Sequence, residues 1–361
     1  MEKYRVGNVG ATGMVGQRFI SLLKDHPWFE VNCVAASARS AGKTYREAVG
    51  ERWAFSWEIP EKVAGMTVVD AADIDEVSKH VDFVFCAVDM KKDEIRALEE
   101  AYAKHEIPVV SNNSACRGIE DVPMVVPEIN ADHLAVIEAQ KKRLGTKNGF
   151  IAVKPNCSIQ SYVPALTPLL DFEPEKVSVC TYQAISGAGK TFKTWPEMVD
   201  NVIPYIGGED EKSENEPLKL WGHVEDGKIV NAALPVISAQ CLRVACSDGH
   251  MAAVSVSFKK KPTIEQIKER WANYETEAQR LELPSAPKPF LQYFEDPSRP
   301  QTRLDRDFQN GFGVSIGRLR EDKLFDYRFV CLSHNTVRGA AGGGILTAEL
   351  LCRKGYIPHR V

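Results

Sequence analysis

The chain starts with a strand-like stretch that runs into a glycine-rich turn, residues 4–16, YRVGNVGATGMVG. Residues 17–24 continue with apolar side chains at helical spacing. A phosphate can approach the main-chain N–H groups of such a turn, which reads Gly10-Ala11-Thr12-Gly13-Met14-Val15-Gly16. A strand, a G-x-x-G-x-x-G turn and a helix in this order favour a dinucleotide-binding unit over a plain strand-to-helix turn.

The end of the second predicted strand indicates which dinucleotide binds. Residues 31–36 (VNCVAA) predict this strand, and residues 37–43 (SARSAGK) follow it. An NAD-binding site normally has an Asp or Glu here for the ribose hydroxyls, and this segment has none. Arg39, with Ser37 and Ser40, would instead hold a 2′-phosphate, because a guanidinium matches the geometry of a phosphate. The segment therefore favours NADP, and the alternative is a solvated basic loop.

Strands and helices continue to alternate through the first part of the chain. Strands are predicted at residues 81–88, 107–111 and 149–153, with a helix at residues 91–104. This pattern predicts an α/β fold, with an N-terminal Rossmann-type doubly wound parallel sheet over residues 1–156. The polar segment of residues 112–117 (NNSACR) follows one predicted strand at the edge where such sheets bind ligands. Arg117 is the residue in it that can hold an anion.

The character of the sequence changes after residue 156. Long strands are predicted at residues 176–185, 236–244, 251–258 and 325–332, with an amphipathic helix at 263–274. We expect an α+β catalytic and dimerisation domain over residues 157–335, with antiparallel strands and a partly exposed sheet. Residues 335–351 predict a final helix that returns to the first domain, which residues 336–361 would complete. The segment 186–190 (SGAGK) lacks the spacing of a phosphate-binding loop, which argues against nucleotide hydrolysis.

A candidate nucleophile lies between the two predicted domains, in Pro155-Asn156-Cys157-Ser158. A strand is predicted before this segment and a helix at residues 162–170 after it, so we expect Cys157 at or just before a helix N-terminus. The main-chain N–H groups there would lower the pKa of the thiol and stabilise the thiolate. The alternative is a buried structural cysteine.

Attack of a thiol on a carbonyl also needs a proton carrier and an anion-binding group. Residues 243–250 (RVACSDGH) supply both around an Asp-Gly turn. His250 would relay protons to and from Cys157, and Arg243 would bind a carboxylate. The alternative for His250 is a structural histidine. No spacing of His, Cys and acidic residues predicts a metal site.

The composition excludes several classes of protein. The chain has 361 residues and is 44% hydrophobic, which favours two domains. Its net charge is −4 with no long charged run, which favours a small-molecule substrate over nucleic acid or a membrane as the partner. None of the nine cysteines forms a C-x-x-C pair, which is typical of reduced thiols in the cytoplasm. No apolar run approaches the ~20 residues that span a bilayer, and we expect no signal peptide.

Taken together, these motifs and residues 183–189 (QAISGAG) resemble the aspartate-semialdehyde dehydrogenase family. The resemblance covers nearly the whole chain and is closest to the archaeal and fungal branch through residues 121–128 (DVPMVVPE) and 206–212 (IGGEDEK). Asn8 departs from it, because the first strand is normally apolar there. The family reduces L-4-aspartyl phosphate to L-aspartate 4-semialdehyde with NADPH through a cysteine thioester, a step in lysine, methionine and threonine biosynthesis. The resemblance also implies a homodimer or homotetramer.

The resemblance implies a role for each matching residue. Cys157 would be the nucleophile and His250 the acid and base. The substrate would be bound by Arg243 at its carboxylate, Gln183 for orientation, Glu216 at its amino group, and Arg117 and Lys219 at its phosphate. NADP and its phosphates would be bound by Gly10, Thr12, Gly13, Met14, Val15, Ser37, Arg39, Ser40, Ser186, Gly187 and Asn335. Three alternatives remain: a coenzyme A thioester reductase such as a malonyl-CoA reductase, an N-acetyl-glutamyl-phosphate reductase, and an inactive nucleotide-binding protein.

Overall fold

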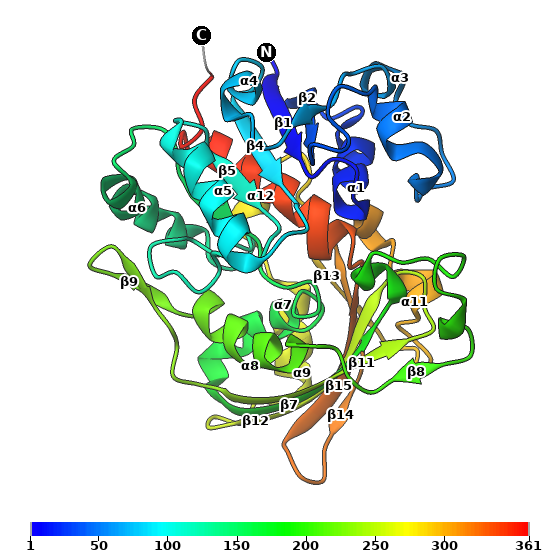
Figure 1. Ribbon diagram of the computed structural model, residues 1–361. Helices are drawn as coiled ribbons and strands as arrows, with labels where there is room; N and C mark the ends of the chain where they lie inside the picture. The colour runs from blue at the N-terminus through cyan, green and yellow to red at the C-terminus, as the bar shows by residue number, and fades with distance from the viewer. Residues whose placement is uncertain (1, 360–361) are drawn as a thin grey trace.

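The first of two large sheets is entirely parallel. A computed structural model describes residues 2–359, and within them this sheet has the strand order β3-β2-β1-β4-β5-β6 (Figure 1). Its strands are β1 (Tyr4–Val9), β2 (Phe29–Ala36), β3 (Val69–Asp70), β4 (Phe83–Cys86), β5 (Val109–Ser111) and β6 (Ile151–Val153). This order is that of the Rossmann dinucleotide-binding fold, so the predicted fold class is confirmed. Residues 1, 360 and 361 of the predicted domain lie outside the described residues.

The helices of this half connect successive strands. They are α1 (Met14–Leu23), α2 (Tyr45–Val49), α3 (Glu61–Ala64), α4 (Ile74–Ser78), α5 (Lys92–Lys104) and α6 (Ile137–Leu144), with short 3₁₀ helices η1 (Gly50–Arg52) and η2 (Ala131–Val136). Helix α1 packs so closely on the glycine turn that a Cβ on Gly16 would lie 2.3 Å from the carbonyl oxygen of Gly10. Asn8 is buried, and its Nδ2 donates to the Gly16 carbonyl at 2.8 Å. Asn8 therefore connects β1 to the first turn of α1.

The second sheet is mixed, with the order β13-β14-β15-β12-β7-β11-β8. Its strands are β7 (Pro174–Gln183), β8 (Val202–Ile203), β11 (Val236–Val244), β12 (His250–Phe258), β13 (Leu291–Phe294), β14 (Val314–Glu321) and β15 (Tyr327–Ser333). Strand β12 is antiparallel to β7 and β15, but β7 pairs in parallel with β11 and β13 with β14. The predicted antiparallel pairing is therefore present for β7, β12, β14 and β15, whereas the parallel pairs of β7 with β11 and of β13 with β14 were not predicted. A separate hairpin consists of β9 (His223–Glu225) and β10 (Lys228–Val230).

Helices cover one face of the second sheet. Helices α7 (Val163–Leu166), α8 (Glu209–Leu220) and α9 (Ile264–Ala272) contact β14, β11 and β13. The other helices of this half are α10 (Glu277–Arg280) and α11 (Thr302–Asp305), with the 3₁₀ helices η3 (Thr167–Phe172), η4 (Ile185–Ala188), η5 (Pro196–Met198) and η6 (Phe308–Gly311). Figure 1 shows α7, α8 and α9 between this sheet and the first half of the chain. On the opposite face Tyr182 and Val236 are exposed, so the sheet is partly open as expected.

The helix predicted at residues 162–170 is broken. Helix α7 ends at Leu166, and the chain continues as the 3₁₀ helix η3. Pro164 lies in the first turn of α7, where its missing N–H costs nothing, whereas Pro168 cannot donate the hydrogen bond that would continue an α-helix.

The last helix returns to the first sheet. It is α12 (Gly342–Arg353), preceded by a short π-helical segment, η7 (Val337–Ala341). Ile345 and Leu350 of α12 share a buried core with Phe19 of α1 and Phe85 of β4. The predicted return of the C-terminal segment is therefore present within the described residues.

The close approach of α1 to its turn gives a first testable prediction. Gly16→Ala should lower the free energy of unfolding by about 1–3 kcal/mol, because the new methyl group overlaps the Gly10 carbonyl. Urea titration measures this change. The control is Gly65→Ala, since a Cβ there meets nothing within 4 Å. Equal stability of the two variants would contradict the packing described here.

Candidate active site

The candidate nucleophile and proton carrier lie in contact. The Sγ atom of Cys157 lies 3.4 Å from Nε2 of His250. Cys157 belongs to the turn after β6, and His250 is the first residue of β12. The two residues are far apart in the sequence, and the junction between the two sheets brings them together as the sequence analysis expected.

Cys157 does not lie at a helix N-terminus. Residues 157–162 form turns, and α7 begins only at Val163. Burial raises the pKa of the Cys157 thiol, and Glu209 raises it further, whereas Lys154, Arg243 and Arg117 oppose the shift. The prediction that a helix terminus lowers this pKa is therefore wrong. The nearby cations favour the thiolate instead.

His250 is buried and held in one orientation. Burial and the positive charge of Arg243 lower its pKa well below the ordinary value, so the ring is neutral at physiological pH. Its Nδ1 accepts a hydrogen bond from the N–H of Ala184 at 3.0 Å. A neutral ring that accepts at Nδ1 carries its hydrogen on Nε2, the atom that faces Cys157. His250 is therefore placed to donate a hydrogen bond from Nε2 to the sulfur or to an oxygen beside it.

Arg243 lies beside this pair. One guanidinium nitrogen, Nη1, donates to the carbonyl of Ala184 at 2.7 Å, so the main chain of Ala184 orients both Arg243 and His250. A Cβ on Gly187 would lie 2.9 Å from Nη1 of Arg243 and 3.0 Å from Nε2 of His250. The space next to the candidate catalytic groups therefore requires a residue without a side chain.

Two glutamates of α8 hold the turn that carries Cys157. Glu209 accepts hydrogen bonds from the Asn156 side chain at 3.0 and 3.1 Å and from Gln183 at 3.1 Å. Glu216 accepts from the Asn156 main-chain N–H at 2.5 Å and pairs with Arg117 at 2.9 Å. The sequence analysis missed Glu209, although it lies in the segment IGGEDEK at the start of a helix.

Lys219 is buried, and its ammonium makes all its hydrogen bonds within the chain. Its ammonium donates to the carbonyls of Arg117, Ile119 and Val122 at 2.7, 2.7 and 3.0 Å. An ammonium has three N–H donors. Lys219 therefore has no free donor for the phosphate role expected of it, and instead holds the loop that carries Arg117.

Eight of the eleven residues predicted for the dinucleotide line two cavities. Six of them line a cavity of about 520 Å³ together with Lys43 and Arg52, namely Gly10, Thr12, Gly13, Ser37, Arg39 and Ser40. Gly10 has φ +91°, and a Cβ on it would lie 2.3 Å from the Ala87 carbonyl oxygen. A glycine turn beside several cations suits a phosphate-bearing cofactor.

The other predicted cofactor residues lie outside this cavity. Met14 and Ser186 line a second cavity of about 200 Å³. Asn335 donates to the Ser186 hydroxyl and accepts from the Gly249 N–H, both at 2.8 Å, so it joins the loops that hold Arg243 and His250. Val15 is partly buried against the core of the first domain.

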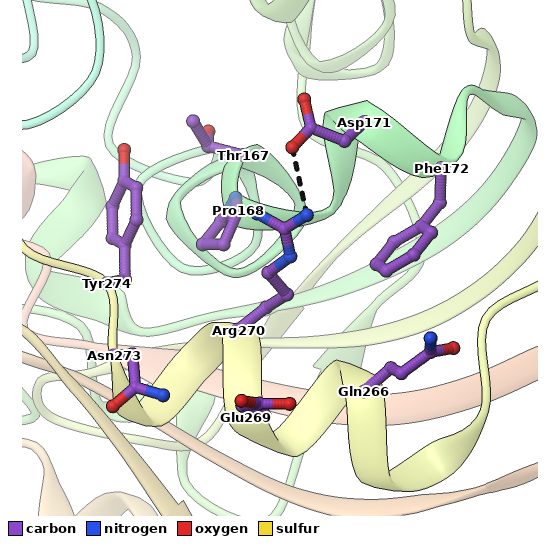
Figure 2. A pocket seen from close by; sticks show the side chains of 9 residues that line it. All are labelled: Thr167, Pro168, Asp171, Phe172, Gln266, Glu269, Arg270, Asn273 and Tyr274. Carbon is purple, nitrogen blue, oxygen red and sulfur yellow. Dashed lines mark ion pairs between the residues drawn. The ribbon is translucent and has the colours of Figure 1, made fainter.

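A further cavity of about 620 Å³ contains none of the predicted site residues. It lies between η3 and α9, and Figure 2 shows Arg270 reaching across it to Asp171, with an N–O distance of 3.0 Å. Within residues 2–359, no cluster of three His, Cys, Asp or Glu side chains could hold a metal ion, and no helix is long and apolar enough to cross a membrane.

The chain matches two family descriptions over most of its length. Residues 5–137 match the semialdehyde dehydrogenase NAD binding domain, and residues 166–338 match the semialdehyde dehydrogenase dimerisation domain. The chain is 45% identical to the aspartate-semialdehyde dehydrogenase of Schizosaccharomyces pombe, over 98% of this chain and 99% of that relative. This chain belongs to the aspartate-semialdehyde dehydrogenase family. The archaeal member from Archaeoglobus fulgidus is 43% identical, over 98% of this chain and 100% of that relative.

The fold of this chain is also similar to that of a solved member of the family. The crystal structure of aspartate semialdehyde dehydrogenase with NADP from Candida albicans superimposes with a TM-score of 0.88 at 38% identity. The superposition covers 99% of this chain and 100% of that one. The fungal and archaeal relatives agree with the branch that the sequence motifs indicated.

The contact between Gly187 and its neighbours gives a second prediction. Gly187→Ala should lower the turnover of aspartate semialdehyde by roughly 10²-fold, because the methyl group displaces Arg243 and His250 by a fraction of an ångström or more. Steady-state kinetics measures this loss, and the thermal midpoint checks that the fold is intact. Wild-type turnover in the variant would show that the site tolerates a side chain at this position.

Proposed function

We propose that this protein is an NADP-dependent aspartate-semialdehyde dehydrogenase that reduces L-4-aspartyl phosphate to L-aspartate 4-semialdehyde and releases phosphate. The observation that carries this proposal is the contact of Cys157 with His250 at 3.4 Å, beside Arg243, in a chain of this family. The reaction belongs to the biosynthesis of lysine, methionine and threonine. The relatives that match over nearly full length bear this enzyme's name, which disfavours an acyl-CoA reductase, an N-acetyl-glutamyl-phosphate reductase and an inactive protein.

The chain's own residues supply the covalent step. The thiolate of Cys157 attacks the acyl carbon, the C–S bond forms, and the C–O bond to the phosphate breaks. NADPH, when bound, supplies the hydride that reduces the resulting thioester. The Nε2–H of His250 donates a hydrogen bond to the oxyanion that forms when hydride reaches the thioester carbon; the carbonyl then re-forms, the C–S bond breaks, and the aldehyde leaves with Cys157 as the thiolate.

The remaining site residues bind and orient the substrate. Arg243 has guanidinium donors beyond the Nη1 that contacts Ala184, and these bind the substrate carboxylate. Gln183 orients the substrate, Glu216 meets its amino group, and Arg117 binds its phosphate. Since Glu209 and Glu216 already hold Gln183 and Arg117, these groups are positioned before substrate arrives.

NADP occupies the cavity beside the glycine turn in this proposal. Its phosphates are contacted by the glycine turn, at Gly10, Thr12, Gly13, Met14 and Val15. The 2′-phosphate is bound by Ser37, Arg39 and Ser40. Ser186, Gly187 and Asn335 bind the nicotinamide end next to Cys157. The Candida albicans relative, whose structure was solved with NADP, supports this assignment.

The enzyme is a homodimer or homotetramer in the cytoplasm in this proposal. Residues 1–156 and 336–361 form the NADP-binding domain, and residues 157–335 form the catalytic and dimerisation domain. The dimerisation-domain match and the partly exposed face of the second sheet, with Tyr182 and Val236, support assembly through this sheet. All nine cysteines are free, in keeping with a reducing compartment.

The reaction itself is tested by the phosphate dependence of NADP⁺ reduction. Aspartate semialdehyde should reduce NADP⁺ in phosphate buffer, and sustained turnover should stop without phosphate. Turnover that needs coenzyme A and ignores phosphate would replace this proposal with the acyl-CoA reductase.

Replacement of the nucleophile gives a third prediction. Cys157→Ser should lose nearly all turnover, because the hydroxyl does not ionise where the thiol does, while NADP⁺ binding is unchanged. Cys180→Ser, on the second sheet, is the matched control. More than roughly a tenth of the wild-type rate in Cys157→Ser would rule out this nucleophile.

A fourth prediction concerns cofactor choice. Arg39→Ala should weaken NADPH binding by about ten- to a hundredfold, because a charge-assisted hydrogen bond to the 2′-phosphate is lost. NADH binding should stay nearly constant, and Arg46→Ala, which removes an exposed ion pair with Glu61 outside the cavity, is the control. Isothermal titration with both cofactors measures this. Equal weakening of NADH and NADPH would show that Arg39 only supports the loop.

A further inference from the structure

Helix α8 contacts the turn that carries the nucleophile with one side and the second sheet with another. Glu209 and Glu216 accept hydrogen bonds from the side chain and the main chain of Asn156. Between these two glutamates Ser213 is buried, and its hydroxyl lies 3.2 Å from that of Ser158. The position of the turn therefore depends on the position of α8.

The two ends of α8 leave hydrogen-bonding groups that the helix itself does not satisfy. The N-cap residue, Gly208, offers no side-chain hydrogen bond to the first turn. Near the other end, Pro217 has no N–H to donate to the carbonyl of Ser213. The hydroxyl of Tyr162 donates to that carbonyl instead, at 2.7 Å. Helix α8 therefore takes its register on the second sheet from contacts along its length.

Asp210 and Glu214 make these contacts with the edge of β11. Asp210 Oδ1 accepts from the main-chain N–H of Cys241 at 2.8 Å, and Glu214 Oε1 accepts from that of Ala239 at 3.0 Å. Strand β7 pairs along one side of β11, whereas β8 pairs on the other side only at the last two residues of β11. The two carboxylates therefore take the place of a neighbouring strand on this edge.

The spacing of these contacts matches a helix that lies beside a strand. Four residues of an α-helix rise about 6 Å, and two residues of a strand span about 6.6 Å. Carboxylates four residues apart on a helix can therefore reach N–H groups two residues apart on a strand. A shift of α8 by one residue would turn both carboxylates about 100° away from the edge. Asp210 and Glu214 thus select one register of α8.

We propose that Asp210 and Glu214 are positioning residues of the reaction: they hold α8 in register on β11, and α8 in turn holds Asn156 and the adjacent Cys157. The inference rests on the proposed function, because it concerns the attack of Cys157 on the substrate. It gives Asp210 a role within residues 206–212, the segment that resembles the archaeal and fungal branch. Hydrogen bonds from main-chain N–H groups to carboxylates are stronger than those between neutral groups, which suits this role.

The test is the burst of NADPH that aspartate semialdehyde and NADP⁺ give in a buffer without phosphate. The amplitude of the burst counts active sites, and its rate reports the attack by Cys157 and the hydride transfer. In Asp210→Ala/Glu214→Ala the rate should fall roughly tenfold or more, because small displacements of a reacting group are costly. The Kd of NADP⁺ should stay the same, since its cavity lies in the first half of the chain. Glu211→Ala, at an exposed position of the same helix, is the control and should match wild type.

A conservative variant separates positioning from folding. In Asp210→Asn/Glu214→Gln the side-chain amide oxygens still accept from the two N–H groups, so most of the lost burst rate should return. A purely structural role would instead lower the burst amplitude of the alanine variant and leave its burst rate unchanged.

The outcomes separate this inference from the proposed function. A wild-type burst rate in the alanine variant, or equal losses in the alanine and amide variants, would overturn the role of Asp210 and Glu214 and leave the enzyme's reaction intact. A wild-type enzyme without a burst would overturn the proposed function itself. If the double alanine variant does not fold, Glu214→Ala alone carries the test, because Asp210 still binds Cys241. A wild-type burst rate in that variant would overturn the inference.

Discussion

A buried ion pair between Arg338 and Glu128 fixes the segment on which the rest of the site depends. The two guanidinium nitrogens contact the two carboxylate oxygens at 2.5 and 2.6 Å, and the side chains are 1% and 0% exposed. The guanidinium also lies over the ring of Phe290, with 4.7 Å to its centroid. Loss of one partner would leave an uncompensated buried charge, at a cost of about 3–5 kcal/mol. The pair therefore sets where η7 lies between the two sheets.

The position of η7 in turn determines the geometry around Cys157. A Cβ on Gly339 would lie 2.9 Å from the Cβ of Cys157, so the nucleophile rests directly on this segment. Asn335, just before η7, joins the loops of Ser186 and Gly249. From the other side, Glu209 and Glu216 hold Asn156. The nucleophile is thus fixed by neighbours from both halves of the chain. Burial and Glu209 raise its pKa, and Lys154, Arg243 and Arg117 oppose that shift.

Local sequence patterns predicted the strands, turns and helix starts that short-range interactions determine. Strands β1 and β11 begin and end where their apolar patterns do, and the glycine turn leads into α1 as expected. The segment 155–158 and the Asp-Gly turn before His250 indicated the pair that the fold brings into contact. What remained hidden depends on partners distant in sequence. Main-chain carbonyls accept from every donor of Lys219, Lys154 is buried, and Glu209 bridges Asn156 and Gln183. These features arise from the packing of distant segments, which no short sequence pattern records. Pro168 was visible in the sequence, but the apolar run around it suggested a continuous helix.

The central claim is that Cys157, in contact with His250 and beside buried cations, carries the acyl group. Mass spectrometry of the enzyme mixed with aspartate semialdehyde and NADP⁺, in a buffer without phosphate, tests it most directly. The account predicts a burst of NADPH equal to the enzyme concentration, followed by a halt, with an aspartyl adduct on the peptide that contains Cys157 and its loss when phosphate is added. An absent burst, or an adduct on any other residue, would contradict the account.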